Sequence, residues 1–167
     1  MEILIVYHSK TGRTKALAEE IARGVGEVED ARCVLKTAAE VTNEDFVSAA
    51  GIIAGSPVYF GSMAAELKAV FDRVVAVRKK LGGKIGAAFA TSDFHAGGKE
   101  TTQLSILQAL LICGMIVVGD PLDASGHYGV SCTGPMDAKT VDFARKLGRR
   151  VARLAAAVQS ASPGTAL

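Results

Sequence analysis

The chain has 167 residues but no tryptophan, only three cysteines and no long hydrophobic run. Its cysteines, Cys33, Cys113 and Cys132, are odd in number and widely spaced, and none belongs to a C-x-x-C pair. This pattern argues against a disulfide framework or a zinc site and favours buried free thiols. Because no stretch approaches the roughly 20 apolar residues of a membrane span, the sequence predicts no transmembrane helix.

The chain also lacks a large excess of positive or negative charge. The chain carries 19 Lys and Arg against 17 Asp and Glu, a net charge of +2, so no nucleic acid or other polyanionic partner is indicated. A charged fraction of 22% and a hydrophobic fraction of 49% are typical of a soluble protein, and the length fits one domain. Glu2 stands where a signal peptide would carry positive charge, which predicts a cytoplasmic protein. We expect one domain over residues 1–158 and a disordered polar tail over residues 159–167.

Short apolar segments alternate with helical patterns along the chain. The expected strands cover residues 3–7, 32–36, 51–55, 85–90 and 115–118. Apolar residues at helical spacing predict helices over residues 17–25, 67–80, 104–111 and 141–158, with a short helix after Asn43. This alternation predicts an α/β fold with a doubly wound, five-stranded parallel sheet.

Two further expectations concern the sheet and one helix. The second strand has polar ends, as an edge strand would, and this favours the strand order 2-1-3-4-5. In such a sheet, ligands bind beyond the carboxyl ends of the first and third strands, where the chain direction switches. The helix over residues 104–111 is indicated by the spacing of Leu104, Leu107 and Leu111, and we expect Gly114 to end it.

The segment Ser9-Lys10-Thr11-Gly12-Arg13-Thr14 connects the first strand to the first helix. Free main-chain N–H groups and the positive end of a helix dipole attract an anion at such a place. The hydroxyls of Ser9, Thr11 and Thr14 add donors without adding charge, which suits a phosphate monoester. The alternative is an ordinary helix N-cap, because Ser and Thr are favoured there as well.

The loop after the third strand places two aromatic residues, Tyr59 and Phe60, beside Gly61. Pro57 stiffens the exit from the sheet, and Gly61 allows a close approach or a positive φ. Aromatic residues beside a glycine suit a flat ring whose edge meets main-chain amides. We expect one of the two aromatics to pack instead on the following helix.

Two later loops also carry aromatic and histidine side chains. The loop over residues 91–100 contains Phe94, His95 and a pair of glycines, although flexibility alone would explain the glycines. The stretch over residues 119–136, which contains Tyr128, is long for a structureless connection and favours a functional loop.

Absent motifs exclude other nucleotide-binding classes. No G-x-x-x-x-G-K-[ST] segment is present, and no G-x-G-x-x-G follows the first strand, which argues against a nucleoside triphosphatase and a dinucleotide-binding site. A phospho-receiver domain would need acidic residues where His8, Ser9 and Ser56 stand. One phosphate together with a flat aromatic ring fits FMN best.

These motifs resemble the flavodoxin-like superfamily. The segment from Ser9 to Thr14 fits the flavodoxin phosphate-loop pattern [ST]-x-T-G-x-T in full. The segment from Gly55 to Met63 is similar to the second flavin loop of WrbA-type NAD(P)H:quinone oxidoreductases and of the related NADPH-dependent FMN reductases. The resemblance extends over residues 3–155, nearly the whole chain.

The resemblance implies where FMN is bound. The phosphate is expected at the first loop, and the isoalloxazine and ribityl chain at the later loops. The cofactor-binding residues so implied are Ser9, Lys10, Thr11, Gly12, Arg13, Thr14, Pro57, Val58, Tyr59, Phe60, Gly61, Thr91, Ser92, Asp93, Phe94, His95, Gly97 and Tyr128. Two departures concern the acceptor site: the tryptophan-bearing segment of the WrbA type is shortened here to residues 78–84, and Cys113 replaces a histidine near the flavin.

The resemblance implies an oxidoreductase that passes two electrons from NAD(P)H through FMN to a quinone-like acceptor, and a homo-oligomer, either a dimer or a tetramer. No catalytic acid or base and no metal ligand is assigned, although the imidazole of His95 is of a type that can donate a proton near neutral pH. The alternative is a flavodoxin, a one-electron carrier between redox proteins. The net charge of +2 argues against this alternative, because flavodoxins are typically strongly acidic.

Overall fold

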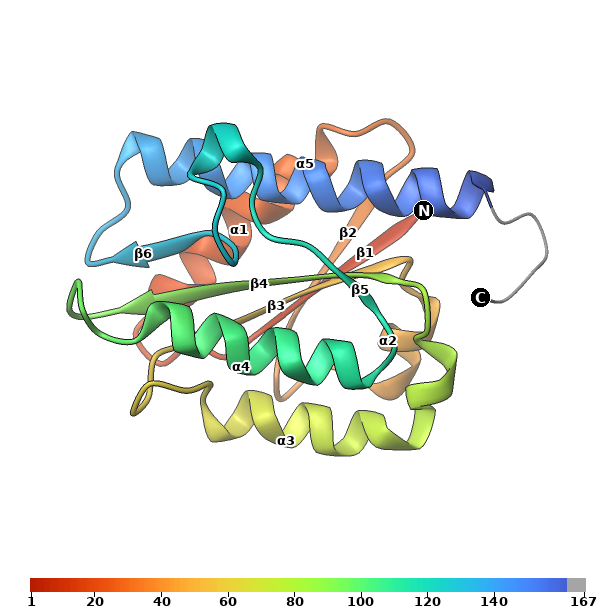
Figure 1. Ribbon diagram of the computed structural model, residues 1–167, viewed down its shortest axis with the longest axis horizontal. Coiled ribbons are helices and arrows are strands. Elements are labelled where there is room, and N and C mark those ends of the chain that lie inside the picture. Colours follow the sequence, from red (N-terminus) through yellow and green to blue (C-terminus); the bar gives the residue numbers. More distant parts are fainter. Residues whose placement is uncertain (162–167) are drawn as a thin grey trace.

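The computed structural model describes residues 1–161, which form a parallel sheet covered by helices on both faces (Figure 1). The strands are β1 (Glu2–Tyr7), β2 (Arg32–Thr37), β3 (Gly51–Pro57), β4 (Ile85–Ser92), β5 (Ile116–Val117) and β6 (Ser131–Thr133). The helices are α1 (Arg13–Gly26), α2 (Asn43–Ser48), α3 (Ala65–Val74), α4 (Lys99–Ile112) and α5 (Ala138–Ala161), with two 3-10 helices, η1 (Val75–Lys80) and η2 (Leu122–Ala124).

The strand order is β2-β1-β3-β4-β5, and every pairing is parallel. This order confirms the sequence-based prediction. Residues 3–6 of β1 are fully buried, because helices cover both faces of the central strands. Strand β2 is only half-buried, which agrees with the edge position predicted from its polar ends.

The carboxyl-terminal half of the sheet differs from the expected five strands. Strand β5 has only two residues, Ile116 and Val117, and a sixth strand, β6, pairs with the end of β4. The register joins Ala90 to Ser131 and Ser92 to Thr133. A three-residue strand has too few alternating positions to stand out in a sequence, and its pairing with β4 is what defines it.

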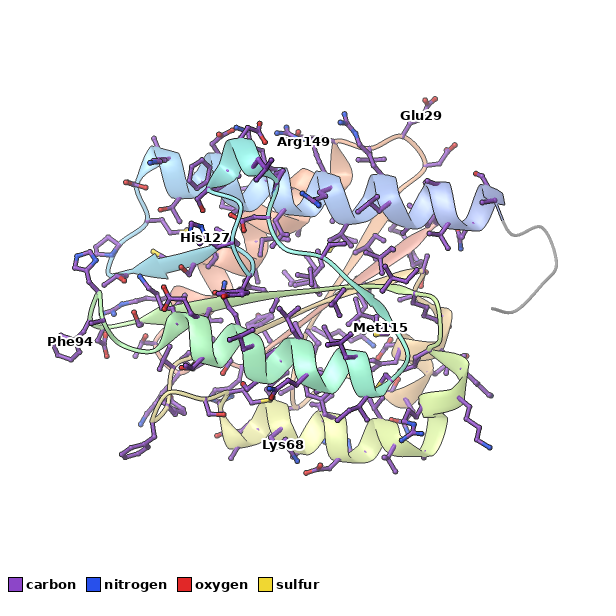
Figure 2. All side chains as sticks on the ribbon, in the orientation of Figure 1. Glu29, Lys68, Phe94, Met115, His127 and Arg149 are labelled. Atoms are coloured by element: carbon purple, nitrogen blue, oxygen red, sulfur yellow. The ribbon has the colours of Figure 1, made fainter. Side chains whose placement is uncertain are left out.

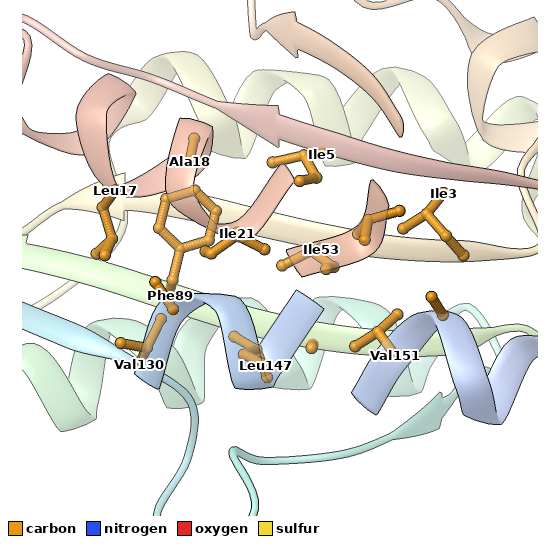
Figure 3. Packing of buried hydrophobic residues seen from close by; sticks show 14 of the residues in the cluster. Ile3, Ile5, Leu17, Ala18, Ile21, Ile53, Phe89, Val130, Leu147 and Val151 are labelled. Atoms are coloured by element: carbon orange, nitrogen blue, oxygen red, sulfur yellow. The ribbon is translucent and has the colours of Figure 1, made fainter. Parts of the chain in front are cut away.

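Two hydrophobic cores lie on opposite faces of the sheet. Helices α1 and α5 cover one face, where Leu17, Ile21, Phe89 and Leu147 interdigitate (Figure 3). Helices α2, α3 and α4 cover the other face. The sheet is therefore buried on both sides, as a doubly wound fold requires.

The predicted helix is confirmed as α4, and packing decides which of its apolar residues are buried. The structure buries Ile106, Leu107 and Leu110, whereas Leu104 and Leu111 are 37% and 54% exposed. Helix α4 is apolar on several sides, so more than one leucine stripe fits helical spacing, and packing against β4 selects among them. Gly114 follows the helix with a φ of +74°, the conformation expected where the helix ends.

The ends of two helices differ from the expected ones. Helix α3 ends at Val74 and continues as the 3-10 helix η1 to Lys80. Helix α5 extends to Ala161, so the first three residues of the expected tail are helical, and residues 162–167 lie outside the described residues. All three cysteines are free thiols, but only Cys132 is fully buried.

No helix within residues 1–161 is both long enough and apolar enough to cross a membrane. Across the same residues, no three His, Cys, Asp or Glu side chains gather as metal ligands.

Candidate functional site

The first loop positions main-chain N–H groups at the start of α1. Gly12 precedes the helix with a φ of +89°, a conformation that glycine adopts without strain. The side chain of Ser9 accepts hydrogen bonds from the N–H groups of Gly12 at 3.2 Å and Lys15 at 3.3 Å. Ser9 therefore acts partly as the helix cap that the alternative interpretation proposed.

Other donors of this loop are left free for a ligand. Within residues 1–161, the main-chain N–H groups of Thr11, Arg13 and Thr14 donate to no protein acceptor. The first turn of α1 contains no acidic residue. The helix dipole and these uncommitted donors therefore favour an anion at this position.

The second loop is a tight hairpin. Tyr59 and Ser62 exchange two main-chain hydrogen bonds of 3.0 Å, and the two residues between them, Phe60 and Gly61, have φ angles of +50° and +75°. Positive φ at both central positions is typical of a type I′ turn, in which phenylalanine is strained. The buried hydroxyl of Ser56 anchors the loop by accepting a hydrogen bond of 2.8 Å from the N–H of Ala64.

The expectation that one aromatic of this loop packs on the next helix is wrong. Phe60 is fully exposed, and Tyr59 is 39% exposed. Phe60 stands at the tip of the hairpin, where no part of residues 1–161 covers its ring. Tyr59 instead faces His8, with the two ring centroids 6.4 Å apart in an edge-on arrangement.

The third loop is tied to both of the others. The N–H of Val58 donates to the carbonyl of Thr91 at 2.8 Å, and the hydroxyls of Thr14 and Thr91 lie 2.8 Å apart. The guanidinium of Arg13 forms an ion pair with the carboxylate of Asp93. Residues far apart in sequence are therefore held at one edge of the sheet, beyond the carboxyl ends of β1, β3 and β4.

The three loops enclose a cavity of about 340 Å³. Every residue that lines it was predicted from the sequence: Lys10, Thr11, Arg13, Thr14, Pro57, Val58, Tyr59, Thr91, Ser92 and Asp93. This volume lies in the usual range for small-molecule sites.

Several predicted residues do not line this cavity. Ser9 and Gly12 belong to the first loop but are not among the residues that line this cavity, and Phe60 and Gly61 form the hairpin tip. Phe94 and His95 are exposed at the tip of the third loop, where Figure 2 shows Phe94 projecting from the molecule. Gly97 closes a turn by donating its N–H to the carbonyl of Phe94 at 3.1 Å.

Tyr128 lies in the segment between β5 and β6, outside this cavity, and is 43% exposed. The buried carboxylate of Asp120 shapes this segment by accepting hydrogen bonds from the N–H groups of His127 at 2.8 Å and Gly129 at 3.2 Å. The amide of Gln103 on α4 donates to the carbonyl of Gly129 at 2.8 Å. The segment is thus an ordered loop.

Sequence reasoning missed two groups near the site. The first is His8, directly after β1: its Nε2 atom lies 3.7 Å from the Glu66 carboxylate, and its ring faces Tyr59. The position of His8 at the end of a central strand was the signal that could have identified it. Cys132 and Met136 form, with Gly12, part of a neighbouring cavity of about 310 Å³. Burial raises the pKa of the Cys132 thiol, so this thiol is neutral at neutral pH.

Residues 1–128 match the model of the NADPH-dependent FMN reductase family. The chain is 35% identical to a flavodoxin of Aquifex aeolicus over 90% of this chain and 85% of that protein. It is 33% identical to an NAD(P)H dehydrogenase (quinone) of Archaeoglobus fulgidus over 92% of this chain and 96% of that protein.

Solved structures show the same fold. A flavodoxin from the domain Archaea has a TM-score of 0.79 at 25% identity, covering 93% of this chain and 99% of its own. A WrbA-like flavodoxin from Agrobacterium tumefaciens has a TM-score of 0.78 at 23% identity, covering 93% and 98%. The α/β fold is therefore flavodoxin-like, as predicted, and the family's description indicates FMN as the flavin, with NAD(P)H as a fitting co-substrate. The chain belongs to the NADPH-dependent FMN reductase family.

Proposed function

We propose that the chain binds FMN in the three-loop cavity and passes two electrons from NAD(P)H to a quinone-like acceptor. The observation that carries the proposal is the set of uncommitted N–H groups of Thr11, Arg13 and Thr14 beside the cavity. FMN held there would supply the hydride-transfer chemistry between NAD(P)H and the acceptor. The family match and the relatives named above support this assignment.

The residues of the first loop fit a phosphate dianion. Free N–H groups, the hydroxyl of Thr11 and the cationic side chains of Lys10 and Arg13 supply donors, and no carboxylate of the loop itself opposes them. Arg13 and Asp93 are both substantially exposed, and exposed ion pairs contribute only about 0–1 kcal/mol. A phosphate dianion can therefore replace Asp93 as the partner of Arg13 at little cost.

The second and third loops fit a flat ring system. The N–H groups of Phe60 and Gly61 have no acceptor among the described residues and suit the polar edge of a ring. Tyr59 lines the cavity, so its ring can shield the flavin from water. Because His95 lies outside the cavity lining, solvent rather than His95 is assigned as the source of protons for the acceptor.

FMN binding is tested by titrating apoprotein with FMN and following the quenching of flavin fluorescence. Thr11→Glu places a carboxylate beside the phosphate and is expected to abolish binding. Gln159→Glu, which adds the same charge at an exposed position of α5, serves as the control and should bind FMN like the wild type. Unchanged affinity of the Thr11→Glu variant would place the phosphate elsewhere.

The reductase activity is tested with FMN-loaded protein under anaerobic conditions. We expect NADH or NADPH oxidation that depends on added benzoquinone. If neither nucleotide is oxidised although FMN is bound, the one-electron carrier becomes the better interpretation. The complete [ST]-x-T-G-x-T pattern over residues 9–14 and the 35% identity to a flavodoxin favour this second candidate.

We further propose that the chain forms a homo-oligomer. Three apolar residues on one side of α4, Leu104, Leu111 and Ile112, are exposed, and so is Ile116 of the neighbouring strand β5. Exposed apolar patches next to a sheet edge commonly mark association surfaces. The double variant Leu111→Glu/Ile112→Glu should lower the mass measured by sedimentation equilibrium, whereas a wild type that sediments as a monomer would exclude the oligomer.

A further inference from the structure

A second cavity, of about 410 Å³, lies between α5 and the segment that leads into η2. Its lining includes the cations Lys146, Arg149, Arg150 and Arg153 and the apolar residues Pro121 and Leu154. Figure 2 shows Arg149 on the outer side of α5, well separated from Phe94 at the flavin-site loops. This basic cleft is therefore distinct from the FMN site.

Helix α5 concentrates positive charge in a chain of nearly balanced charge. It contains six Lys or Arg residues and one acidic residue, whereas the whole chain has a net charge of +2. The four cations of the basic cleft are spaced at i, i+3, i+4 and i+7 from Lys146, a spacing that places them on one face of a helix. Their charges therefore converge on the same cavity.

Two of these cations are already neutralised. The ammonium of Lys146 lies 3.0 Å from a carboxylate oxygen of Asp123 and 3.0 Å from one of Asp142. The guanidinium of Arg149 forms an ion pair with Glu27. These pairs fix the cleft wall but leave little capacity to bind another anion.

The other two cations, Arg150 and Arg153, are uncommitted. Within residues 1–161, neither guanidinium forms an ion pair with a carboxylate. Arg150 makes only a long hydrogen bond of 3.4 Å to the main-chain carbonyl of Asp120. Two planar guanidinium groups one helical turn apart, beside a cavity, match the oxygen atoms of phosphate groups.

We propose that the basic cleft binds a small phosphorylated molecule with a planar ring, of the nucleoside diphosphate class. Arg150 and Arg153 would hold the diphosphate, and the ring would lie against Pro121 and Leu154. The volume of the cavity falls in the range of small-molecule pockets, which favours a small ligand as its occupant. The inference does not depend on the proposed function, because the cleft is remote from the flavin loops.

The test is isothermal titration of FMN-loaded protein with ADP, pyrophosphate and adenosine. We expect one saturable ADP site, weaker binding of pyrophosphate and no binding of adenosine. The double variant Arg150→Gln/Arg153→Gln should weaken ADP at least tenfold. The matched control Lys79→Gln/Lys80→Gln removes two exposed cations from η1 and should bind ADP like the wild type.

Amide chemical shifts locate the ligand independently of the variants. ADP should shift the amides of Leu154 and Ala124 and leave those of Thr11 and Phe94 unchanged. Absence of saturable ADP binding, or unchanged binding in the arginine double variant, would overturn the proposal. If poly-glutamate binds and ADP does not, the cleft takes an acidic protein segment and the proposal is wrong.

Discussion

The hydroxyl oxygen of Thr14, at the start of α1, lies 2.8 Å from that of Thr91, at the end of β4. Both residues are buried, at 2% and 5% exposure. This hydrogen bond joins the first and third loops around the cavity across 77 positions of sequence. It links the stability of the fold directly to the shape of the cavity.

Thr14→Val and Thr91→Val should each destabilise the protein by about 1–3 kcal/mol, because each leaves a buried hydroxyl without a partner. The double variant should lose less stability than the sum of the losses in the two single variants, because it leaves no hydroxyl without a partner. Urea unfolding of the four proteins measures the coupling. Strictly additive losses would show that the hydroxyls do not interact.

Gly12→Ala should weaken FMN binding beyond its effect on stability. Alanine at a φ of +89° costs about 1–2 kcal/mol, and relief of this strain would move the N–H groups of the first loop. Gly114→Ala introduces comparable strain at a φ of +74° at the end of α4, away from the cavity. FMN titration should separate the two variants; equal FMN affinities would contradict a phosphate site at the first loop.

Gly148→Ala should destabilise the fold by about 1–3 kcal/mol. A methyl group at Gly148 would overlap the main-chain carbonyl of Ile21, because α1 and α5 approach too closely there to admit a side chain. Gly26 has no atom within 4 Å of the corresponding position, so Gly26→Ala should leave the thermal midpoint unchanged or slightly higher. Similar midpoints for both variants would argue against the close helix contact.

Asp45 should contribute to loss of stability in acid. Burial raises the pKa of Asp45, but the hydrogen bonds from Lys36 and Thr42 lower this pKa by more than burial raises it. The pKa of Asp45 therefore lies below its usual value of 3.8. The unfolded chain therefore binds more protons than the native state in this range, and stability falls as pH drops below about 4. Urea unfolding at several pH values should show a shallower acid loss for Asp45→Asn; identical pH dependence would remove Asp45 from this role.

The structure clarifies why some parts of the site were predictable. Each residue that lines the three-loop cavity belongs to one of three short segments at the ends of strands, and the carboxyl ends of parallel strands necessarily meet at one edge. The positions of the aromatic side chains were harder to predict, because helical or strand spacing does not specify the type of a turn. The positive φ of Phe60, which exposes its ring, is a property of the hairpin closed by Tyr59 and Ser62.

Local hydrophobic patterns and loop composition were enough to predict the strand order, the edge position of β2 and the segments that surround the cavity. Three features appeared only in the folded structure: which leucines of α4 are buried, the pairing of β6 with β4, and the convergence of Arg150 and Arg153 on one cleft. These features depend on which surfaces meet after folding. Several side-chain arrangements satisfy the same sequence periodicity, and packing selects one of them.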